Sequence, residues 1–452
     1  MKKSLRRAYW FASSIFKRYA VIIIASVVVG VIATLNASKV VQFLPRSHTN
    51  YIGRAGSYSL SQLPLDIQHL ISSGLTAVDS SGKPIPGIAQ SWNIQESGKR
   101  YQFTLDPNMY WQDGTSIIAS DIDINLKDVT VEIINDHSLV FNLKDPFSPF
   151  PVVVSQPVFK KVNYRKFLFF SRTKIIGTND YSITNIKTSG GIITELTLKS
   201  KQEKKVYRFY PTEEEAVTAF MLGKIDQIED ISNPKSLSDW KDLTITKKVH
   251  TDKYVAVFFN TQDPSLSNKS IRQALAYTIP KDTFEENRAL SPINPLSWAY
   301  NPQVKPYKFD LAIAKDLLDS NTDPEADPIS ITLSTTQAFI DLAELIKSSW
   351  EDLGIEINIR IVNFPDTSDY QVLLIGQQIP IDPDQYTYWH STQGTNFTRY
   401  NSPRVDKLLE DGRKTLDEDE RTLIYQDFQR FITEDSPAIF LYHLDSYHIE
   451  RN

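Results

Sequence analysis

The sequence predicts a mixed α/β fold that is divided into two or three lobes. Its 452 residues exceed what one hydrophobic core usually serves. Segments with alternating apolar and polar residues are interleaved with segments whose apolar residues recur at helical spacing. At Gly223 and again at Gly354, a helical segment ends at a glycine and passes directly into a strand-like segment. This repeated order is typical of α/β lobes.

The first half of the chain, after residue 35, contains short strands separated by turns. Residues 36–52 predict a polar linker that leads into a first strand. The segments 100–105 (RYQFTL) and 137–143 (HSLVFNL) alternate as half-buried strands do. Thr212 and Glu215 form a capping-box pattern that predicts a helix through Ala216 and Phe220, closed at Gly223. Residues 224–231 then predict a strand.

The second half repeats this pattern. One helical face is predicted before Gly354, and alternating isoleucines predict a strand over 355–361. A last helix is expected over about 417–434, leading into an apolar strand over 437–444. The predicted helical face before Gly354 consists of Phe339, Leu342, Ala343, Ile346, Trp350 and Leu353.

Charge and cysteine content exclude several classes of function. The net charge is −5, and acidic and basic residues are interspersed, so no surface suited to nucleic acid is expected. The chain has no cysteine. Disulfides, thiolate metal sites, a cysteine nucleophile and a thioether-linked lipid anchor are therefore excluded.

The N-terminus predicts a single membrane anchor. Residues 1–18 carry six basic residues and no acid, and the first carboxylate of the chain is Asp66. The apolar segment 19–35 would span roughly 26 Å as a helix, at the short end of what crosses a bilayer. The charge asymmetry predicts a cytoplasmic N-terminus, with the main domain outside the membrane. Two alternatives remain: a cleavable signal, although cleavage after Ala37 places Leu35 at −3, and a buried core helix.

Catalytic motifs are absent, apart from one ambiguous stretch. No phosphate-binding loop, serine elbow or two-histidine zinc helix is found. Residues 381–390 bring together Asp382, Asp384 and His390, but a calcium loop would need an oxygen ligand at Tyr386 and glycine at Thr387. Three interpretations of Asp-Pro-Asp stay open, namely a turn, a ligand-lining loop and an acid–base pair. The nearby Trp389 and Tyr400 fill core or line an aromatic site.

Several segments, in this order, carry a family likeness. Residues 74–122 contain A-x-S-W, Y-x-F-x-L and W-x-D-G-T-x-x-x-A-x-D. Residues 176–183 (IGTNDYSI), 258–282 (FFNT to IPKD) and 381–442 follow. Together they resemble the bacterial extracellular solute-binding proteins of family 5, over about residues 55 to 445. The matching positions in the first segment are Ala89, Ser91, Trp92, Tyr101, Phe103, Leu105, Trp111, Asp113, Gly114, Thr115, Ala119 and Asp121.

The resemblance implies a fold and a function. The fold is a two-lobed periplasmic-binding-protein-like fold (type II, peptide-binding cluster) with an extra subdomain, here preceded by one transmembrane helix. It implies lobe I from 53–77, 173–250 and 435–452, the subdomain from 78–172, and lobe II from 251–434. A peptide or other small polar solute would bind in the cleft, the hinge would close, and the monomer would deliver the solute to ABC permease subunits. It implies no cofactor, no metal and no catalytic residue. The expected solute-binding residues are Tyr254, Gln377, Gln378, Asp382, Asp384 and Trp389.

The chain also departs from the family pattern. Peptide-binding relatives carry W-x-x-D shortly before Asp-Pro-Asp, supplying a carboxylate to the ligand ammonium, whereas Gly376 to Ile379 stand here. The helix that usually follows the subdomain's A-x-D is expected to be deleted, because 120–134 runs almost directly into a strand. These departures motivate a second hypothesis, a degenerate relative that acts as a surface interaction or sensor module. A third hypothesis is an extracellular hydrolase that uses Asp382, Asp384 or His390.

Overall fold

The computed structural model describes residues 48–167, 170–323, 328–363 and 369–452, together with 19–20, 26 and 325. The chain divides into two compact units, 50–200 with 205–452, and 1–49 with 201–204. Apart from residues 19, 20 and 26, the predicted anchor 19–35 lies outside the described residues. Among the described residues, no helix is both long and apolar enough to cross a membrane.

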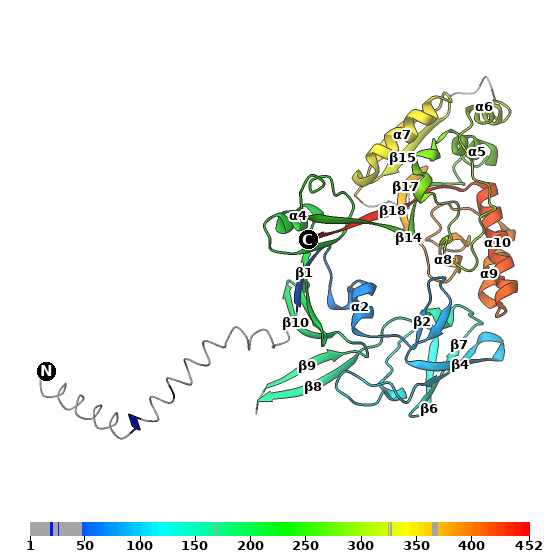
Figure 1. Ribbon diagram of the computed structural model, residues 1–452. Helices are drawn as coiled ribbons and strands as arrows, with labels where there is room; N and C mark the ends of the chain where they lie inside the picture. Colours follow the sequence, from blue (N-terminus) through cyan, green and yellow to red (C-terminus); the bar gives the residue numbers. More distant parts are fainter. Residues whose placement is uncertain are drawn as a thin grey trace, which may run out of the picture. The chain divides into compact units, whose positions relative to one another are not determined.

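A ten-stranded mixed sheet is the framework of the larger unit (Figure 1). Apart from the first residues of β1 and β12, it belongs wholly to that unit. Its strands in spatial order are β10 (Ser182–Ser189), β11 (Ile192–Lys199), β12 (Glu203–Tyr210), β1 (His48–Ala55), β13 (Gln227–Ile231), β18 (Ala438–Arg451), β14 (Leu243–Phe259), β17 (Val372–Gln378), β15 (Ser330–Thr335) and β16 (Glu356–Ile361).

Strands β14 and β18 pair along most of their length, with one register shift between His250 and Tyr254 and a second between Val255 and Ala256. The antiparallel register runs from Leu243 opposite Arg451 to His250 opposite Leu444, and resumes at Tyr254 opposite His443. Residues 251–253 are therefore an insertion in β14 that has no partner on β18. Such a bulge bends and twists a strand locally. The sheet consequently has two parts, one on each side of 251–253.

Each face of the sheet's second part has its own core, because side chains alternate along β14. Val255, Val257 and Phe259 belong to one core and Tyr254 and Phe258 to the other. The helices over the first core are α5 (Lys269–Thr278), α6 (Leu311–Asp319) and α7 (Ile340–Glu351). Those over the second are α8 (Tyr386–Trp389), α9 (Pro403–Lys414) and α10 (Glu418–Asp435).

The predicted helices that end at glycine are confirmed. In α7, Ile346 and Trp350 are fully buried, and Gly354 closes the turn with a φ of 81° before β16 begins. In α4 (Glu213–Met221), the Thr212 side chain accepts a hydrogen bond from the Glu215 amide at 3.3 Å. That helix and α2 (Leu65–Ile71) cover separate cores on the sheet's first part.

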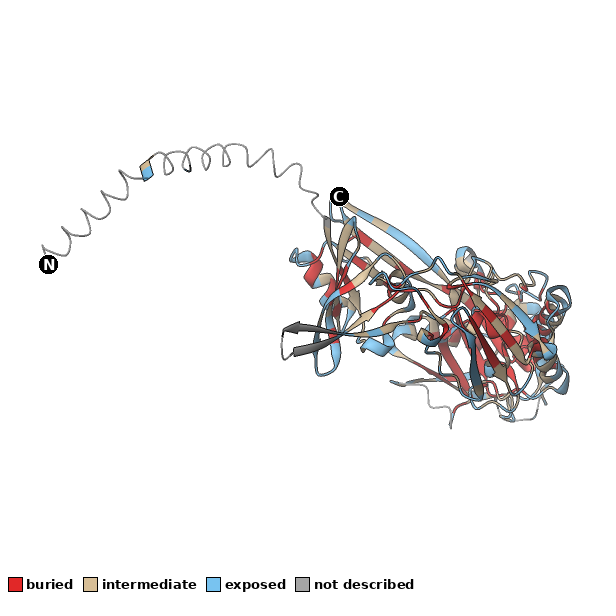
Figure 2. Ribbon diagram, turned by 90° about the horizontal axis from the view of Figure 1, so that it is seen from below, coloured by how far each residue is buried: buried red, intermediate tan, exposed pale blue. Residues whose placement is uncertain are grey.

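A separate four-stranded sheet in the order β4-β5-β7-β6 has its own aromatic core and includes the two strands predicted in this region. Between β5 and β6, where every residue is described, the one helical element is the three-residue 3-10 turn Ala119–Asp121, so this segment contains no α-helix, as the sequence predicted. Figure 2 shows the buried residues gathered in the interior of the larger unit. The strands are β4 (Ala89–Gln95), β5 (Arg100–Leu105), β6 (Val129–Asn135) and β7 (Ser138–Leu143), and α3 (Phe150–Val153) lies beside them.

The remaining elements are short. Two pairs of strands form separate ribbons, β2 (Thr76–Val78) with β3 (Pro84–Pro86), and β8 (Lys160–Phe167) with β9 (Phe170–Ile176). Further 3-10 turns occur at Leu60–Gln62, Glu96–Gly98, Lys281–Asn287 and Gln337–Phe339.

Candidate functional site

The bulge in β14 places two of the expected site residues in direct contact. Tyr254 follows the bulge and lies opposite Gln377 on β17. The Tyr254 hydroxyl donates a hydrogen bond to the Gln377 side-chain oxygen, and both residues are buried. Burial raises the pKa of Tyr254 well above its usual value, so the hydroxyl remains a neutral donor.

Polar side chains next to this pair face solvent at the same level of the sheet. Gln378 is exposed and donates from its amide to the Asp252 carboxylate at 3.1 Å. The Asp252 side chain is 47% exposed and also lies 3.6 Å from the His250 ring. Asp252 also accepts, through its backbone carbonyl, a hydrogen bond from the Ile379 amide at 2.7 Å. One accessible carboxylate is thus held at the end of β17.

Behind Asp252, the polar contacts continue into the first part of the sheet. His250 Nε2 lies 2.6 Å from the Ser446 hydroxyl, and that hydroxyl donates to Asp230 at 3.1 Å. Asp230 has a φ of 57° and also accepts a hydrogen bond from Arg54. Burial is the largest influence on His250 and lowers its pKa. These contacts connect the bulge to strands β1 and β13.

The two aspartates of the Asp-Pro-Asp sequence are paired within the protein. Asp382 accepts two hydrogen bonds from the Arg421 guanidinium of α10, at 2.6 and 3.0 Å. Asp384 accepts from Arg413 of α9 at 2.8 Å. Burial raises the pKa of Asp384, and Arg413 opposes that rise. Because each carboxylate already has a guanidinium partner, neither is free for a ligand ammonium.

Trp389 belongs to the core behind Tyr254. It is 1% exposed, and its ring lies 6.0 Å from Phe440, which in turn contacts Tyr254 edge-on at 5.2 Å. The structure therefore brings Tyr254, Gln377 and Gln378 together, with Trp389 beneath them and Asp382 and Asp384 in ion pairs with neighbouring helices. Within the described residues, no group of three or more acidic or histidine side chains is suited to a metal ion.

Sequence reasoning did not identify three residues of this site, Asp230, His250 and Asp252. His250 and Asp252 stand in the segment HTDKY, which interrupts the hydrophobic pattern just before the apolar end of β14. That interruption is the one sequence signal for the bulge. No local sequence signal connects Asp230 to this site. Asp230 reaches the site through the pairing of β13 with β18.

Comparison with known proteins identifies the family. The model of the bacterial extracellular solute-binding proteins, family 5 (middle region), matches residues 123–398. The oligopeptide-binding protein AppA of Bacillus subtilis is 23% identical over 455 residues, covering 85% of this chain and 83% of AppA.

Solved structures share the fold. NikZ from Campylobacter jejuni, in complex with Ni(L-His), superimposes with a TM-score of 0.69 at 24% identity and covers 89% of this chain and 94% of its own. Bacillus subtilis AppA in complex with a nonapeptide gives a TM-score of 0.66 at 20% identity, with coverages of 90% and 95%. The family match spans more than half of the chain and confirms the resemblance inferred from the sequence motifs. The chain belongs to the bacterial extracellular solute-binding proteins, family 5.

Proposed function

We propose that this chain is the extracytoplasmic solute-binding subunit of an ABC importer, and that it captures peptides or similar polar solutes and delivers them to permease subunits. Family membership carries this proposal, together with relatives named as oligopeptide- and dipeptide-binding proteins. Because the family consists of binding proteins, the chain is not an enzyme, and the hydrolase hypothesis for Asp382, Asp384 and His390 is not retained.

The proposed lobes follow the two parts of the ten-stranded sheet. Lobe I comprises 53–77, 173–250 and 444–452, lobe II comprises 251–443, and 78–172 forms the extra subdomain. Since residues 438–443 of β18 pair with β14 beyond the bulge, we place the boundary within β18, at 443/444, rather than at 435. The bulge at 251–253 then acts as the hinge on β14.

The proposed solute contacts are Asp252, Gln378 and Gln377, with Tyr254 positioning the Gln377 amide. A ligand ammonium needs a counter-charge when it is desolvated. The segment 376–379 has no carboxylate, but Asp252 brings one beside Ile379. The loop behind this surface is attached to helix α10 through Asp382 and to helix α9 through Asp384. Trp389 packs beneath the surface against Phe440.

We also propose that residues 19–35 anchor the chain in the cell membrane, with the basic segment 1–18 in the cytoplasm. The support is the apolar composition of 19–35 and the absence of any acidic residue before Asp66.

Native mass spectrometry of the full-length chain tests the proposed function. A co-purifying peptide mass that is lost on unfolding is expected. Asp252→Asn should weaken binding of that peptide by about tenfold but leave its N-acetylated form unaffected. Asp239→Asn, an exposed substitution elsewhere, is the control. A chain that is empty and is not stabilised by peptide mixtures would contradict the proposal and favour the interaction-module hypothesis.

A further inference from the structure

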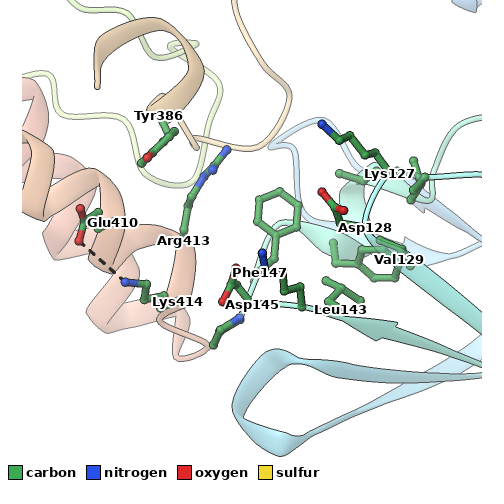
Figure 3. A pocket seen from close by; sticks show the side chains of 15 residues that line it. Lys127, Asp128, Val129, Leu143, Asp145, Phe147, Tyr386, Glu410, Arg413 and Lys414 are labelled. Atoms are coloured by element: carbon green, nitrogen blue, oxygen red, sulfur yellow. Dashed lines mark ion pairs between the residues drawn. The ribbon is translucent and has the colours of Figure 1, made fainter. Parts of the chain in front are cut away.

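A cavity of about 690 Å³ lies between the four-stranded sheet and helix α9, away from the Tyr254 surface. Figure 3 shows Phe147 at its centre, with Arg413 and Tyr386 on one side and Asp128 and Val129 on the other. Its volume is within the range of small-molecule sites. Its apolar lining consists of Leu126, Val129, Leu143, Pro146, Phe147, Phe150 and Val153.

One wall of the cavity contains the tripeptide Leu-Lys-Asp twice, each time as the end of a repeated four-residue sequence. The sequence Asn-Leu-Lys-Asp occurs at 125–128, before β6, and again at 142–145, at the end of β7. Because β6 and β7 are antiparallel, with Val129 opposite Leu143, both copies lie at the same end of the hairpin. Each copy contributes one leucine to the lining and one lysine–aspartate pair to the rim.

The four charges of these two copies have no partner in the described structure. Lys127, Asp128, Lys144 and Asp145 are exposed, and none forms an ion pair or a side-chain hydrogen bond with a described residue. The charges of the opposite wall are satisfied instead. Arg413 binds Asp384 at 2.8 Å, and Lys414 lies 3.8 Å from Glu410.

The two walls of the cavity are attached to each other. The Ser148 amide donates to the Arg413 carbonyl at 2.7 Å, and the Ser148 hydroxyl donates to the Gly412 carbonyl at 3.1 Å. The Arg413 guanidinium also lies 5.2 Å from the centre of the Phe147 ring and 4.0 Å from that of Tyr386. The cavity is therefore a fixed feature of this contact.

We propose that this cavity is a second binding site, for a zwitterionic solute with an apolar body, such as an amino acid or dipeptide with an aliphatic or aromatic side chain. The apolar lining takes the side chain. One lysine takes the carboxylate, and one aspartate takes the ammonium. The free charges at the rim cancel, so a purely anionic or purely cationic ligand gains less than a zwitterion. This proposal goes beyond the proposed transport function and does not depend on it.

Photo-cross-linking with a diazirine analogue of leucine tests the second site on the purified full-length chain in lipid nanodiscs. Labelling is expected within 126–129 and 143–150, and excess leucine should suppress it. Two double variants should each reduce labelling about tenfold, namely Lys127→Gln/Lys144→Gln and Asp128→Asn/Asp145→Asn. The first removes the charged contact to the solute carboxylate, and the second removes the charged contact to its ammonium. These exposed substitutions should leave the thermal midpoint unchanged. The matched control is Lys315→Gln/Asp319→Asn on α6.

The site of labelling separates this proposal from the transport function. Equal labelling in the rim variants, or labelling confined to 250–254 and 377–379, would overturn the second site while leaving the proposed transport function intact. Competition by N-acetylleucine or leucinamide as strong as that by leucine would overturn the zwitterion specificity, because each of these competitors lacks one charge.

Discussion

The ion pair of Asp382 with Arg421 couples the loop after β17 to helix α10. Their side chains are 9% and 7% exposed, and the guanidinium contacts both carboxylate oxygens. Arg421 also donates to the Gly412 carbonyl at 2.7 Å. Removing one charge from such a pair leaves the other buried without a partner, which costs more than the pair contributes to stability.

Asp382→Asn should therefore lower the free energy of unfolding by about 3 kcal/mol. Asp427→Asn is the matched control, because Asp427 also pairs with an arginine of α10 but both side chains are about half exposed. The control should change stability by less than about 1 kcal/mol. Urea denaturation of both variants measures the difference. Equal losses would show that the Asp382 pair behaves as a surface pair.

At the residue scale, a turn was one of the three interpretations that the sequence left open for Asp-Pro-Asp, and the arginine partners of the two aspartates were not predicted. The Asp384 amide donates to the Asp382 carboxylate at 2.9 Å, and the Tyr386 amide to Asp384 at 3.1 Å, as the turn interpretation of Asp-Pro-Asp requires. Arg413 and Arg421 are remote in sequence, and no spacing rule connects them to the loop. The same holds for Asp230, which reaches the candidate site through strand pairing.

At the scale of elements, helices α9 and α10 approach closely because α9 carries a glycine at the contact. A Cβ at Gly412 would lie 2.7 Å from the Tyr425 ring and 2.8 Å from its hydroxyl. Tyr425 is fully buried in the core that also contains Trp389. Neither side of the contact has space to absorb an extra methyl group.

Gly412→Ala should lower stability by about 1–3 kcal/mol through overpacking, even though alanine favours a helix. Gly394→Ala is the control, since a Cβ there meets nothing within 4 Å. Thermal unfolding followed by circular dichroism measures both. A neutral or stabilising effect of Gly412→Ala would mean that α9 and α10 separate without loss of packing.

The sequence predicted those elements whose apolar residues recur at one regular spacing, as in the helix α7 and the alternating strand β16. Strand β18 extends to Arg451, beyond the predicted 444. The extension was not predicted because most residues after 444 are polar, and only Ser446 and Ile449 among them are buried. Strand β14 was not predicted, since its first half is polar and the bulge shifts its alternation. Both long strands are defined by pairing with each other, which a local pattern does not encode.

At the scale of the whole molecule, β14 and β18 are the strands that connect the two parts of the ten-stranded sheet within the described structure. β17 pairs with β14 only from Lys253 onward, and β13 pairs with the C-terminal half of β18. Since residues 251–253 have no partner on β18, a rotation at this point breaks few ladder hydrogen bonds. The main-chain geometry thus suits a hinge.

Solute binding should therefore change the distance between the two parts of the sheet but not distances within either part. The chain has no cysteine, so Lys224→Cys/Lys315→Cys gives two unique positions for a donor and an acceptor dye, one before β13 and one on α6. Transfer efficiency should change when the co-purified peptide is added back to unfolded and refolded, ligand-free protein. The control pair, Lys315→Cys/Glu344→Cys, places both dyes on helices of one core and should give a constant signal. Constant transfer in the first pair at saturating peptide would show that binding occurs without hinge motion, and the bulge would then be a feature of strand packing alone.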